Sequence, residues 1–382
     1  MGLPKLEEFI PDPFFPDTLL VHDPDCCTQH NQPTDQPVKY KRVRYPLQNE
    51  VRLSRSALIQ SIDSQDAPDA ASAPEPVAQS TSGERVAHLY LKESNRLGTG
   101  HHSDVYRAPF TLPPPLSAHS RTGQVTVAAK LAFPHCTAHL LLHNEARTYA
   151  AFPEHAQQEY CGYNVVPPCR FPVPVGPIVP KSYGFYLPVG DDGKIVDGYR
   201  REIAKHGACM GQYEPCEVPW LSPILLLEEC GEPVKPKKFT VDQRTECFSL
   251  VLRLHELGIE QGSFYVRNIL IQPGPLSAPA AKRTFDQPSF RIIDFGRAQV
   301  LQDMLKRADE RETRDAEIRK QQRLRKKGEG GVETEEEKKK AQEDDEKERQ
   351  EARARVFTDM RMILHREEQQ ARRELHLDDI GF

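Results

Sequence analysis

Apolar positions in the middle of the chain alternate along short runs or recur at helical spacing. Between about residue 86 and about residue 300, the short runs predict strands and two longer stretches predict helices. The expected strands cover residues 88–91, 104–108, 124–133, 181–188, 224–229, 269–271 and 290–293. The expected helices cover residues 138–152 and 240–257. This part of the chain is therefore predicted to be α+β.

The first 85 residues follow no such pattern and are rich in Pro, Asp, Ser and Gln. A segment of this composition buries too little apolar surface to offset the entropy of ordering it, so we predict that residues 1–85 are largely disordered. The basic cluster at residues 39–44 is interpreted as a solvated edge strand, with a localisation or docking element as the alternative. Residues 190–220 are expected to form an insertion with a short helix near residues 199–205.

Charged residues dominate the chain after residue 300. Between residues 303 and 355, 34 of 53 residues are charged, 17 of each sign. Opposite charges four residues apart support an exposed helical extension over residues 301–355, with a break at 328–331. A solvated extension is the plain interpretation, and a coiled coil with a partner protein is the alternative, although no sustained heptad is present. Residues 356–382 regain apolar positions and predict a terminal helix that packs back on the protein.

Composition restricts where the protein acts. The 382-residue chain has a net charge of −5 and no run of 18 apolar residues, so we expect no membrane span and no nucleic-acid partner. The first 15 residues lack an apolar stretch of the kind found in signal peptides. Nine cysteines without a CxxC pair are typical of reduced, structural thiols, which predicts a cytoplasmic or nuclear protein.

A glycine-containing turn lies between the first two predicted strands of the middle part. Residues 97–106 read LGTGHHSDVY and contain Gly98 and Gly100, followed by Val105. A turn of this kind can bring backbone amides close to phosphate groups, although a plain hairpin turn explains the same residues.

Two further charged residues lie at the end of a predicted strand and on the helix that follows it. Lys130 ends the apolar strand that reads VAAK, and Glu145 follows 15 residues later on the next predicted helix. A lysine at a strand end can reach phosphates while a helical carboxylate holds it in place. The alternatives are an ordinary lysine whose charged end reaches solvent and an exposed helical glutamate.

Two motifs near residue 300 carry oxygen ligands suited to magnesium. Residues 261–270 read QGSFYVRNIL and contain Asn268, and residues 290–296 read FRIIDFG and contain Asp294 at the end of an apolar strand. Carboxylate and amide oxygens are hard ligands of the kind that Mg²⁺ prefers.

In this order, the five elements resemble those of the protein kinase superfamily, and in particular divergent fungal-type protein-kinase-like proteins whose catalytic loop reads GSFYVRNIL. The resemblance implies an α+β, bilobal protein-kinase-like fold with a β-rich N-lobe and a truncated helical C-lobe. The disordered N-terminal region and the long charged C-terminal helix flank it. The implied divisions are 1–85, the N-lobe with insertions at 86–231, the C-lobe with the catalytic loop and DFG at 232–300, the charged extension at 301–355, and a terminal helix on the C-lobe at 356–382.

The resemblance also assigns roles around the nucleotide. Gly98 and Gly100 would close over the phosphates, and Val105 would cover the adenine. The backbone of Glu228 to Cys230, at the end of a predicted strand, would offer hydrogen bonds to the adenine.

The remaining roles concern phosphates and metal. Lys130 would bind the α- and β-phosphates and pair with Glu145. Asn268 and Asp294 would bind magnesium. The implied cofactors are therefore ATP and Mg²⁺.

The chain departs from the kinase pattern at the catalytic base. Ser263 stands where kinases have the catalytic Asp, and a serine hydroxyl, which is neutral at pH 7, does not accept a proton as a carboxylate does. Within residues 261–268 no carboxylate replaces it, and Glu260 is expected on the far side of the motif. Only 86 residues follow Gly296, most of them charged, and no A-P-E motif is present. We therefore expect phosphoryl transfer by this protein to be impaired.

These residues predict a kinase-like domain that binds ATP and Mg²⁺ and acts as a pseudokinase or weak phosphotransferase, serving as a switch or scaffold. Whether it is an enzyme is left open. One alternative is an active divergent kinase that phosphorylates protein Ser/Thr or a small molecule. The other is a scaffold without nucleotide that binds a protein partner through the charged helix at 303–355.

Overall fold

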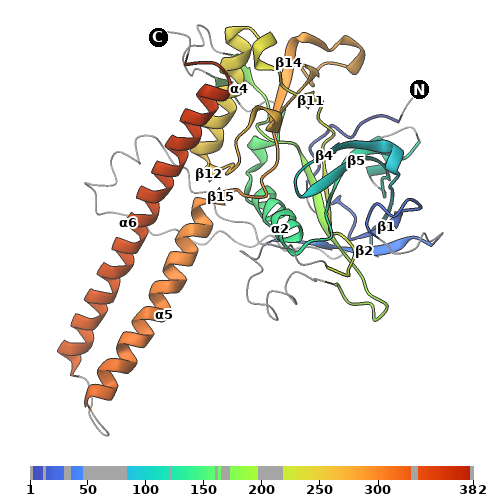
Figure 1. Ribbon diagram of the computed structural model, residues 1–382. Coiled ribbons are helices and arrows are strands. Elements are labelled where there is room, and N and C mark those ends of the chain that lie inside the picture. The colour runs from blue at the N-terminus through green and yellow to red at the C-terminus, as the bar shows by residue number, and fades with distance from the viewer. Residues whose placement is uncertain are drawn as a thin grey trace.

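The structure is a computed structural model of the 382-residue chain. A β-barrel lies at one side of the molecule, and a long helical hairpin projects from the other (Figure 1). The structure describes residues 3–11, 14–29, 36–45, 84–114, 116–119, 122–159, 162–164, 173–196, 218–327 and 334–378.

Eight strands form one sheet, and seven of them close into the barrel. The order around the barrel is β3-β1-β2-β9-β10-β6-β5, and the pairing of Leu89 with Phe110 joins β3 back to β5. The eighth strand, β4, pairs with β5 outside the ring. The strands are β1 (Thr18–His22), β2 (Val38–Val43), β3 (Val86–Tyr90), β4 (Arg96–Thr99), β5 (Ser103–Thr111), β6 (Gln124–Ala132), β9 (Ser182–Pro188) and β10 (Ile224–Leu227).

Alternation along the strands fills the barrel interior. Successive side chains of a strand point to opposite faces, so Tyr106, Ala108 and Phe110 of β5 all turn inward and are fully buried. They join an interior cluster that includes Leu19 and Leu226. Strand β6 is buried on both faces because α2 (Cys136–Ala151) packs on its outer side, which explains its nearly continuous apolar sequence.

The predicted bilobal kinase fold is wrong, because the expected N-lobe sheet is a closed barrel. Strands β1 and β2 join β3 to β9 and close the sheet. Both strands lie in the segment predicted to be disordered, and residues 39–44 were expected at a sheet edge, whereas β2 has a neighbour on each side. Closure removes the edges that an open sheet would expose. The part of the predicted disordered region at 46–83 lies outside the described residues.

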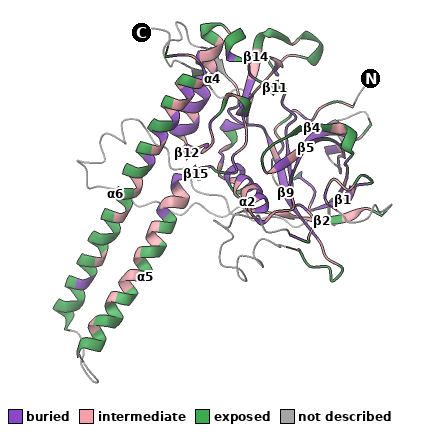
Figure 2. Ribbon diagram, in the orientation of Figure 1, coloured by how far each residue is buried: buried purple, intermediate pink, exposed green. Residues whose placement is uncertain are grey.

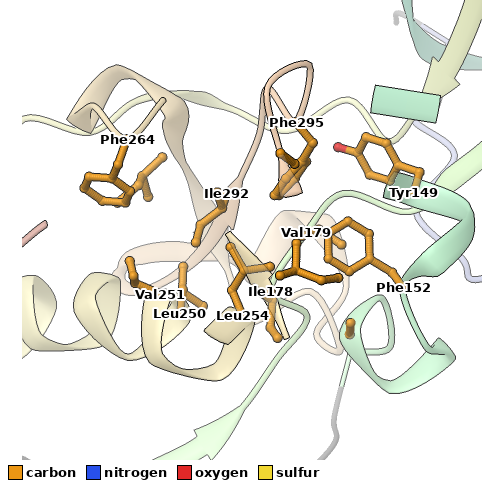
Figure 3. Close-up of a cluster of buried hydrophobic side chains, with 14 of the residues drawn as sticks. Tyr149, Phe152, Ile178, Val179, Leu250, Val251, Leu254, Phe264, Ile292 and Phe295 are labelled. Atoms are coloured by element: carbon orange, nitrogen blue, oxygen red, sulfur yellow. The ribbon is translucent and has the colours of Figure 1, made fainter. Parts of the chain in front are cut away.

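The remaining elements form small sheets and helices beside the barrel. A core of buried side chains runs from the outer face of β6 and β10 through α2 to α4 (Val241–Glu256) and the end of α6. Figure 3 shows part of this core around Phe152, Leu254 and Phe295. The small sheets are β11 (Glu232–Pro233) with β13 (Ile269–Gly274) and β14 (Thr284–Ile292), β12 (Ile259–Glu260) with β15 (Gln299–Val300), and β7 (Gly162–Asn164) with β8 (Val173–Val175).

The strands and helices predicted for the middle part are confirmed at their positions, with β14 as the main difference in length. It begins at Thr284, inside a stretch expected to be a loop, and pairs with β13 across a register shift. The capping box of Thr240 and Gln243 sets the start of α4. The short helix expected near residues 199–205 lies outside the described residues.

The charged C-terminal region forms two paired helices, α5 (Leu301–Lys327) and α6 (Glu335–Glu374). They are largely exposed along their length, and apart from Ala341 their buried residues lie near the root (Figure 2). A small apolar cluster with Leu305 and Leu364 packs at that root, and an ion pair of Arg319 with Asp345 joins the helices farther out. The helix predicted to begin at residue 356 is not separate, because α6 runs unbroken through that position.

Because the barrel closes between β3 and β5, we expect the stability of the fold to depend strongly on Phe110. Phe110→Ala removes a fully buried ring at the β3–β5 junction and is expected to lower the free energy of unfolding by about 3–5 kcal/mol. Phe285→Ala, at an exposed position in β14, serves as the control and should change it by less than about 0.5 kcal/mol. Urea denaturation of both variants measures the difference, and equal losses would contradict the barrel interior described above.

Candidate functional site

A buried lysine bonded to two carboxylates lies where the barrel meets α2 and β14. Lys130 Nζ, at the end of β6, lies 2.6 Å from Glu145 Oε2 on α2 and 2.9 Å from Asp294 Oδ1 after β14. The Glu145 side chain is 2% exposed and that of Lys130 is 11% exposed, whereas that of Asp294 is 47% exposed. The cluster therefore presents one carboxylate to solvent and keeps the other inside.

The charges of this cluster support one another. Burial by itself lowers the pKa of Lys130, but the two carboxylates raise it above its ordinary value, so the ammonium keeps its charge. The same ammonium lowers the pKa of Asp294, which stays ionised. Burial raises the pKa of Glu145, and Lys130 opposes that shift. The cluster thus holds a stable cation next to an ionised and accessible carboxylate.

Backbone geometry sets Asp294 apart from its neighbours. Its φ is +68°, a left-handed conformation that non-glycine residues rarely adopt. The next residue, Phe295, is fully buried and packs edge-on against Tyr149 and Phe152 (Figure 3). The buried ring holds the chain while the turn at Asp294 directs its carboxylate to Lys130. An unusual φ held by its surroundings is a frequent property of functional positions.

The glycine-containing turn lies next to this cluster in the sheet. Gly98 on β4 pairs with Val105 on β5, and Val105 pairs in turn with Lys130 on β6. A Cβ built on Gly98 would meet no atom within 4 Å, so the space beside the turn is open. The N–H of Gly100 donates to Ser103 O within the turn. Gly98, Val105 and Lys130 are therefore neighbours across three adjacent strands.

The loop at residues 261–268 is fastened to Asp294 by Gln261. Gln261 Nε2 donates to the backbone oxygens of Ile293 and Asp294, and its Oε1 accepts from Ser263 N. Asn268 Nδ2 donates to Ser263 O, which leaves the amide oxygen Oδ1 as the atom able to bind a metal. The backbone of Asn268 accepts from Ile293 N, so this residue adjoins the segment that carries Asp294.

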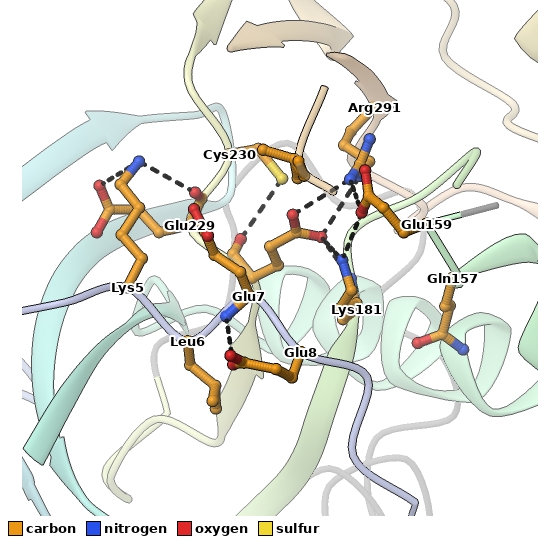
Figure 4. Close-up of polar contacts among 12 residues, drawn as sticks. Lys5, Leu6, Glu7, Glu8, Gln157, Glu159, Lys181, Glu229, Cys230 and Arg291 are labelled. Atoms are coloured by element: carbon orange, nitrogen blue, oxygen red, sulfur yellow. Dashed lines mark hydrogen bonds and ion pairs between the residues drawn. The ribbon is translucent and has the colours of Figure 1, made fainter. Parts of the chain in front are cut away.

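Glu228 and Cys230 belong to a different cluster. The Glu228 carboxylate is buried, 3.4 Å from Lys181 and 3.3 Å from Arg291. Figure 4 shows Lys181 and Arg291 side by side, close to Glu159. Burial by itself raises the pKa of Glu228, but the two cations bring it below its ordinary value. The Glu228 N–H donates to Lys181 O, and its carbonyl accepts from the Cys230 thiol at 3.7 Å. The Glu228 backbone groups predicted to face an adenine therefore have partners within the protein.

Helix α6 holds the 261–268 loop through side chains that the sequence analysis did not single out. Glu367 accepts hydrogen bonds from the N–H groups of Gln261 and Gly262, at 3.0 and 2.9 Å. Further along the same helix, Gln370 donates to Phe264 O and Glu374 accepts from Val266 N. Their spacing of three and four residues places them on one helix face. That spacing was a signal in the sequence, but nothing there showed which loop they meet.

His255 on α4 completes this contact. Its Nε2 lies 2.8 Å from Glu367 Oε2, and its Nδ1 lies 3.2 Å from Glu368 Oε1. Burial by itself lowers the pKa of His255, but the hydrogen bonds with the two glutamates raise it above its ordinary value. A charged His255 therefore ties α4 to the helix that holds the loop.

A small pocket of about 240 Å³ contains both Ser263 and Glu260, together with Arg297 and Arg366. The prediction that Glu260 lies on the far side of the motif is therefore wrong. Its Oε2 is buried without a hydrogen-bond partner among the described residues. Burial, and next the charge of Glu367, raise the pKa of Glu260 to about 7, against weaker opposing effects of Gln299, His255 and Arg366.

Comparison with known proteins assigns no family. No family model matches the chain, and no curated protein matches it. Within the described residues, none of the helices combines the length and apolar character that a membrane span requires. The same residues contain no group of three or more His, Cys, Asp or Glu side chains placed to hold a metal ion by themselves.

Because Glu367 of α6 bonds to the 261–268 loop, we expect its removal to destabilise the protein strongly. Glu367→Ala leaves one buried and one partly buried N–H group without an acceptor and removes one of the two carboxylates that bond to His255, so the free energy of unfolding should fall by about 3 kcal/mol. Glu351→Ala, at an exposed position of the same helix, is the control and should cost less than about 0.5 kcal/mol. Chemical denaturation distinguishes them, and a Glu367 variant as stable as the control would refute this role.

The raised pKa of Glu260 predicts that this residue lowers the stability of the fold in a pH-dependent way. The folded protein binds this proton more tightly than the unfolded chain, whose pKa is near 4.5, so ionisation of Glu260 destabilises the fold increasingly as pH rises from 4.5 to about 7. Glu260→Gln removes the ionisation. Relative to the wild type, the variant should gain stability between pH 5 and pH 8 in urea denaturation. A difference that is independent of pH would contradict the raised pKa.

Proposed function

We propose that this protein binds ATP with Mg²⁺ at the Lys130 cluster. The observation that carries the proposal is that Lys130 Nζ bonds to Glu145 and Asp294 at the same time. A lysine kept charged by an inner carboxylate, beside an accessible outer one, has the arrangement that phosphate and metal binding require. The proposal rests on this site and does not depend on a kinase fold, because the same chemistry occurs on unrelated folds.

The residues of the cluster fit a magnesium nucleotide. Asp294 and Asn268 supply a carboxylate and an amide oxygen, which are hard ligands suited to Mg²⁺. Magnesium is commonly bound by one or two protein oxygens, with phosphates and water completing its shell, so a larger group of acidic side chains is not needed. When bound, Mg²⁺ would neutralise part of the negative charge of the phosphates. In this proposal, the Lys130 ammonium turns from Asp294 to the phosphates while it stays bonded to Glu145.

The open turn beside Lys130 offers room for the phosphates. Gly98 has free space on the side where a Cβ would lie, and Val105 presents an apolar side chain next to Lys130. The Glu228 backbone is already bonded within the protein, so the support for an adenine contact at Glu228 to Cys230 is weaker than the support for phosphate binding.

Phosphoryl transfer at this site is proposed to be impaired, which makes the protein a nucleotide-dependent switch or scaffold. Ser263 has no carboxylate with which to accept a proton, and a positioned acid–base group typically contributes about 10²–10⁴-fold to a rate. The Ser263 backbone is held on both sides, by Gln261 and by Asn268, so the loop keeps its shape without the usual base. Nucleotide would then stabilise one arrangement of the barrel and α2 against the loop.

A second candidate function is slow phosphoryl transfer, and one observation favours it. Glu260 lines the same pocket as Ser263 and has a pKa raised to about 7, which suits a proton acceptor near neutral pH. In this alternative, Glu260 would receive the proton of an acceptor hydroxyl that lies in the pocket.

Thermal unfolding with ATP, with and without Mg²⁺, tests the proposal. The wild type should show a rise in Tm that needs Mg²⁺, because a ligand that binds only the folded state stabilises it. Asp294→Asn should remove the Mg²⁺ dependence, and Lys130→Met should reduce the shift with ATP. Asp286→Asn, an exposed position on β14, is the matched control and should keep the wild-type shift.

The same proteins distinguish the two functions. Radiolabelled phosphate transfer or ATP hydrolysis that is lost in Lys130→Met, Asp294→Asn and Glu260→Gln would favour the slow transferase. Nucleotide binding without turnover would favour the switch. Absence of any shift in the wild type at saturating ATP and Mg²⁺ would overturn both.

A further inference from the structure

An open groove of about 660 Å³ lies between the segment after β11 and the end of α6. One wall is formed by residues 234–238, which include the short 3₁₀ helix Pro236–Lys238. The other wall is formed by Arg373, Glu374 and His376, where α6 ends. Val266 of the loop that α6 holds closes one side. The groove is thus separate from the Lys130 cluster.

The rim of the groove is positively charged and lacks internal compensation. Lys235, Lys237, Lys238 and Arg373 are exposed, and none of them forms an ion pair among the described residues. The single carboxylate in the lining, Glu374, accepts a hydrogen bond from Val266 N. The chain as a whole has a net charge of −5, so this local excess of positive charge differs in sign from the rest of the protein. Positive potential of this kind attracts an acidic partner.

The floor of the same groove is apolar. The surface that the groove leaves accessible is mostly apolar. Val234 and Pro236 contribute only small exposed areas to it, and Val266, which is half-buried, packs against the hydrophobic core. A free phosphate or another small anion would pair with the rim and leave this floor exposed to water. A peptide with an apolar side chain between acidic residues satisfies both, since its apolar side chain covers the floor while its carboxylates face the lysines.

We propose that this groove binds an acidic peptide segment of a partner protein, with one or two apolar side chains seated on Val234 and Pro236. Lys237, Lys238 and Arg373 pair with its carboxylates from the two walls. The lysine side chains are long and exposed, so each pair is individually weak and specificity comes from the combination of rim and floor. The proposal does not depend on nucleotide binding.

The position of the groove connects its occupant to the loop. Glu374 lines the groove and also holds Val266 N, and the same helix face holds the loop at Gln261 and Gly262. A peptide in the groove therefore contacts the end of α6 that fastens the loop.

The test is a titration of the 382-residue protein into a fluorescein-labelled peptide of Glu-Glu-Leu-Glu-Phe-Glu-Glu sequence, followed by anisotropy. We expect saturable binding with one site that weakens as salt is added. The triple variant Lys237→Glu, Lys238→Glu, Arg373→Glu should bind the peptide at least about tenfold more weakly, because the attraction is lost and like charges then repel each other. The matched control Arg325→Glu, Lys326→Glu, Lys340→Glu changes the net charge equally on the exposed helical hairpin and should bind as the wild type does.

Two further comparisons make the result decisive. A peptide with Ser in place of Leu and Phe should bind more weakly than the parent peptide, and Asp294→Asn should bind the parent peptide normally. Thermal melts of each variant confirm that it is folded. Absence of saturable binding, equal loss in the control variant, or equal binding of the Ser-substituted peptide would overturn the proposal. Preference for pyrophosphate or a single-stranded oligonucleotide over the peptide would also overturn it.

Discussion

Burial of the Lys130 ammonium is the constraint on which the arrangement of the site depends. A buried cation is costly unless opposite charges and hydrogen bonds compensate it, and Lys130 obtains this from Glu145 and Asp294. These three residues come from β6, from α2, which follows β6 directly, and from the segment after β14, 164 residues beyond Lys130. Their contact therefore fixes how the barrel, the helix on its outer face and the adjoining small sheet meet. The buried ring of Phe295 reinforces that meeting point with apolar packing.

The second organising contact is the one between α6 and the loop that carries Ser263. Glu367 meets two successive backbone N–H groups and His255, so one carboxylate joins α6, α4 and the loop. Most of the α5–α6 hairpin is exposed, yet its last turns form part of the main core through Ala371 and Leu375. A hairpin built in this way is connected to the candidate site at one end and free at the other. Any partner that binds near the end of α6 lies close to the loop.

The closed barrel shows why a motif-based assignment of fold failed here while its local predictions held. Each predicted strand of the middle part depends on an apolar run that is visible in the sequence, and each is present. Closure depends on β1 and β2, whose residues are interspersed among prolines and charges, as in Val38–Val43 with its two lysines and one arginine. Their pairing with β3 and β9 is not a local property. A set of residues typical of nucleotide sites can thus be carried by an architecture other than the one with which it is usually associated.

The sequence by itself determined the elements and the identity of the residues at the Lys130 cluster. Apolar periodicity located the strands and helices, and resemblance to short kinase motifs singled out Lys130, Glu145, Asn268 and Asp294, because both signals are local. Only the tertiary structure decided that Glu260 shares a pocket with Ser263. It also decided that Glu228 forms ion pairs with Lys181 and Arg291, and that Glu367 bonds to the loop. These facts depend on contacts between residues up to 106 positions apart, such as Gln261 with Glu367. Polar side chains of this kind have no periodicity that reveals their partners, and only the folding of the chain brings them together.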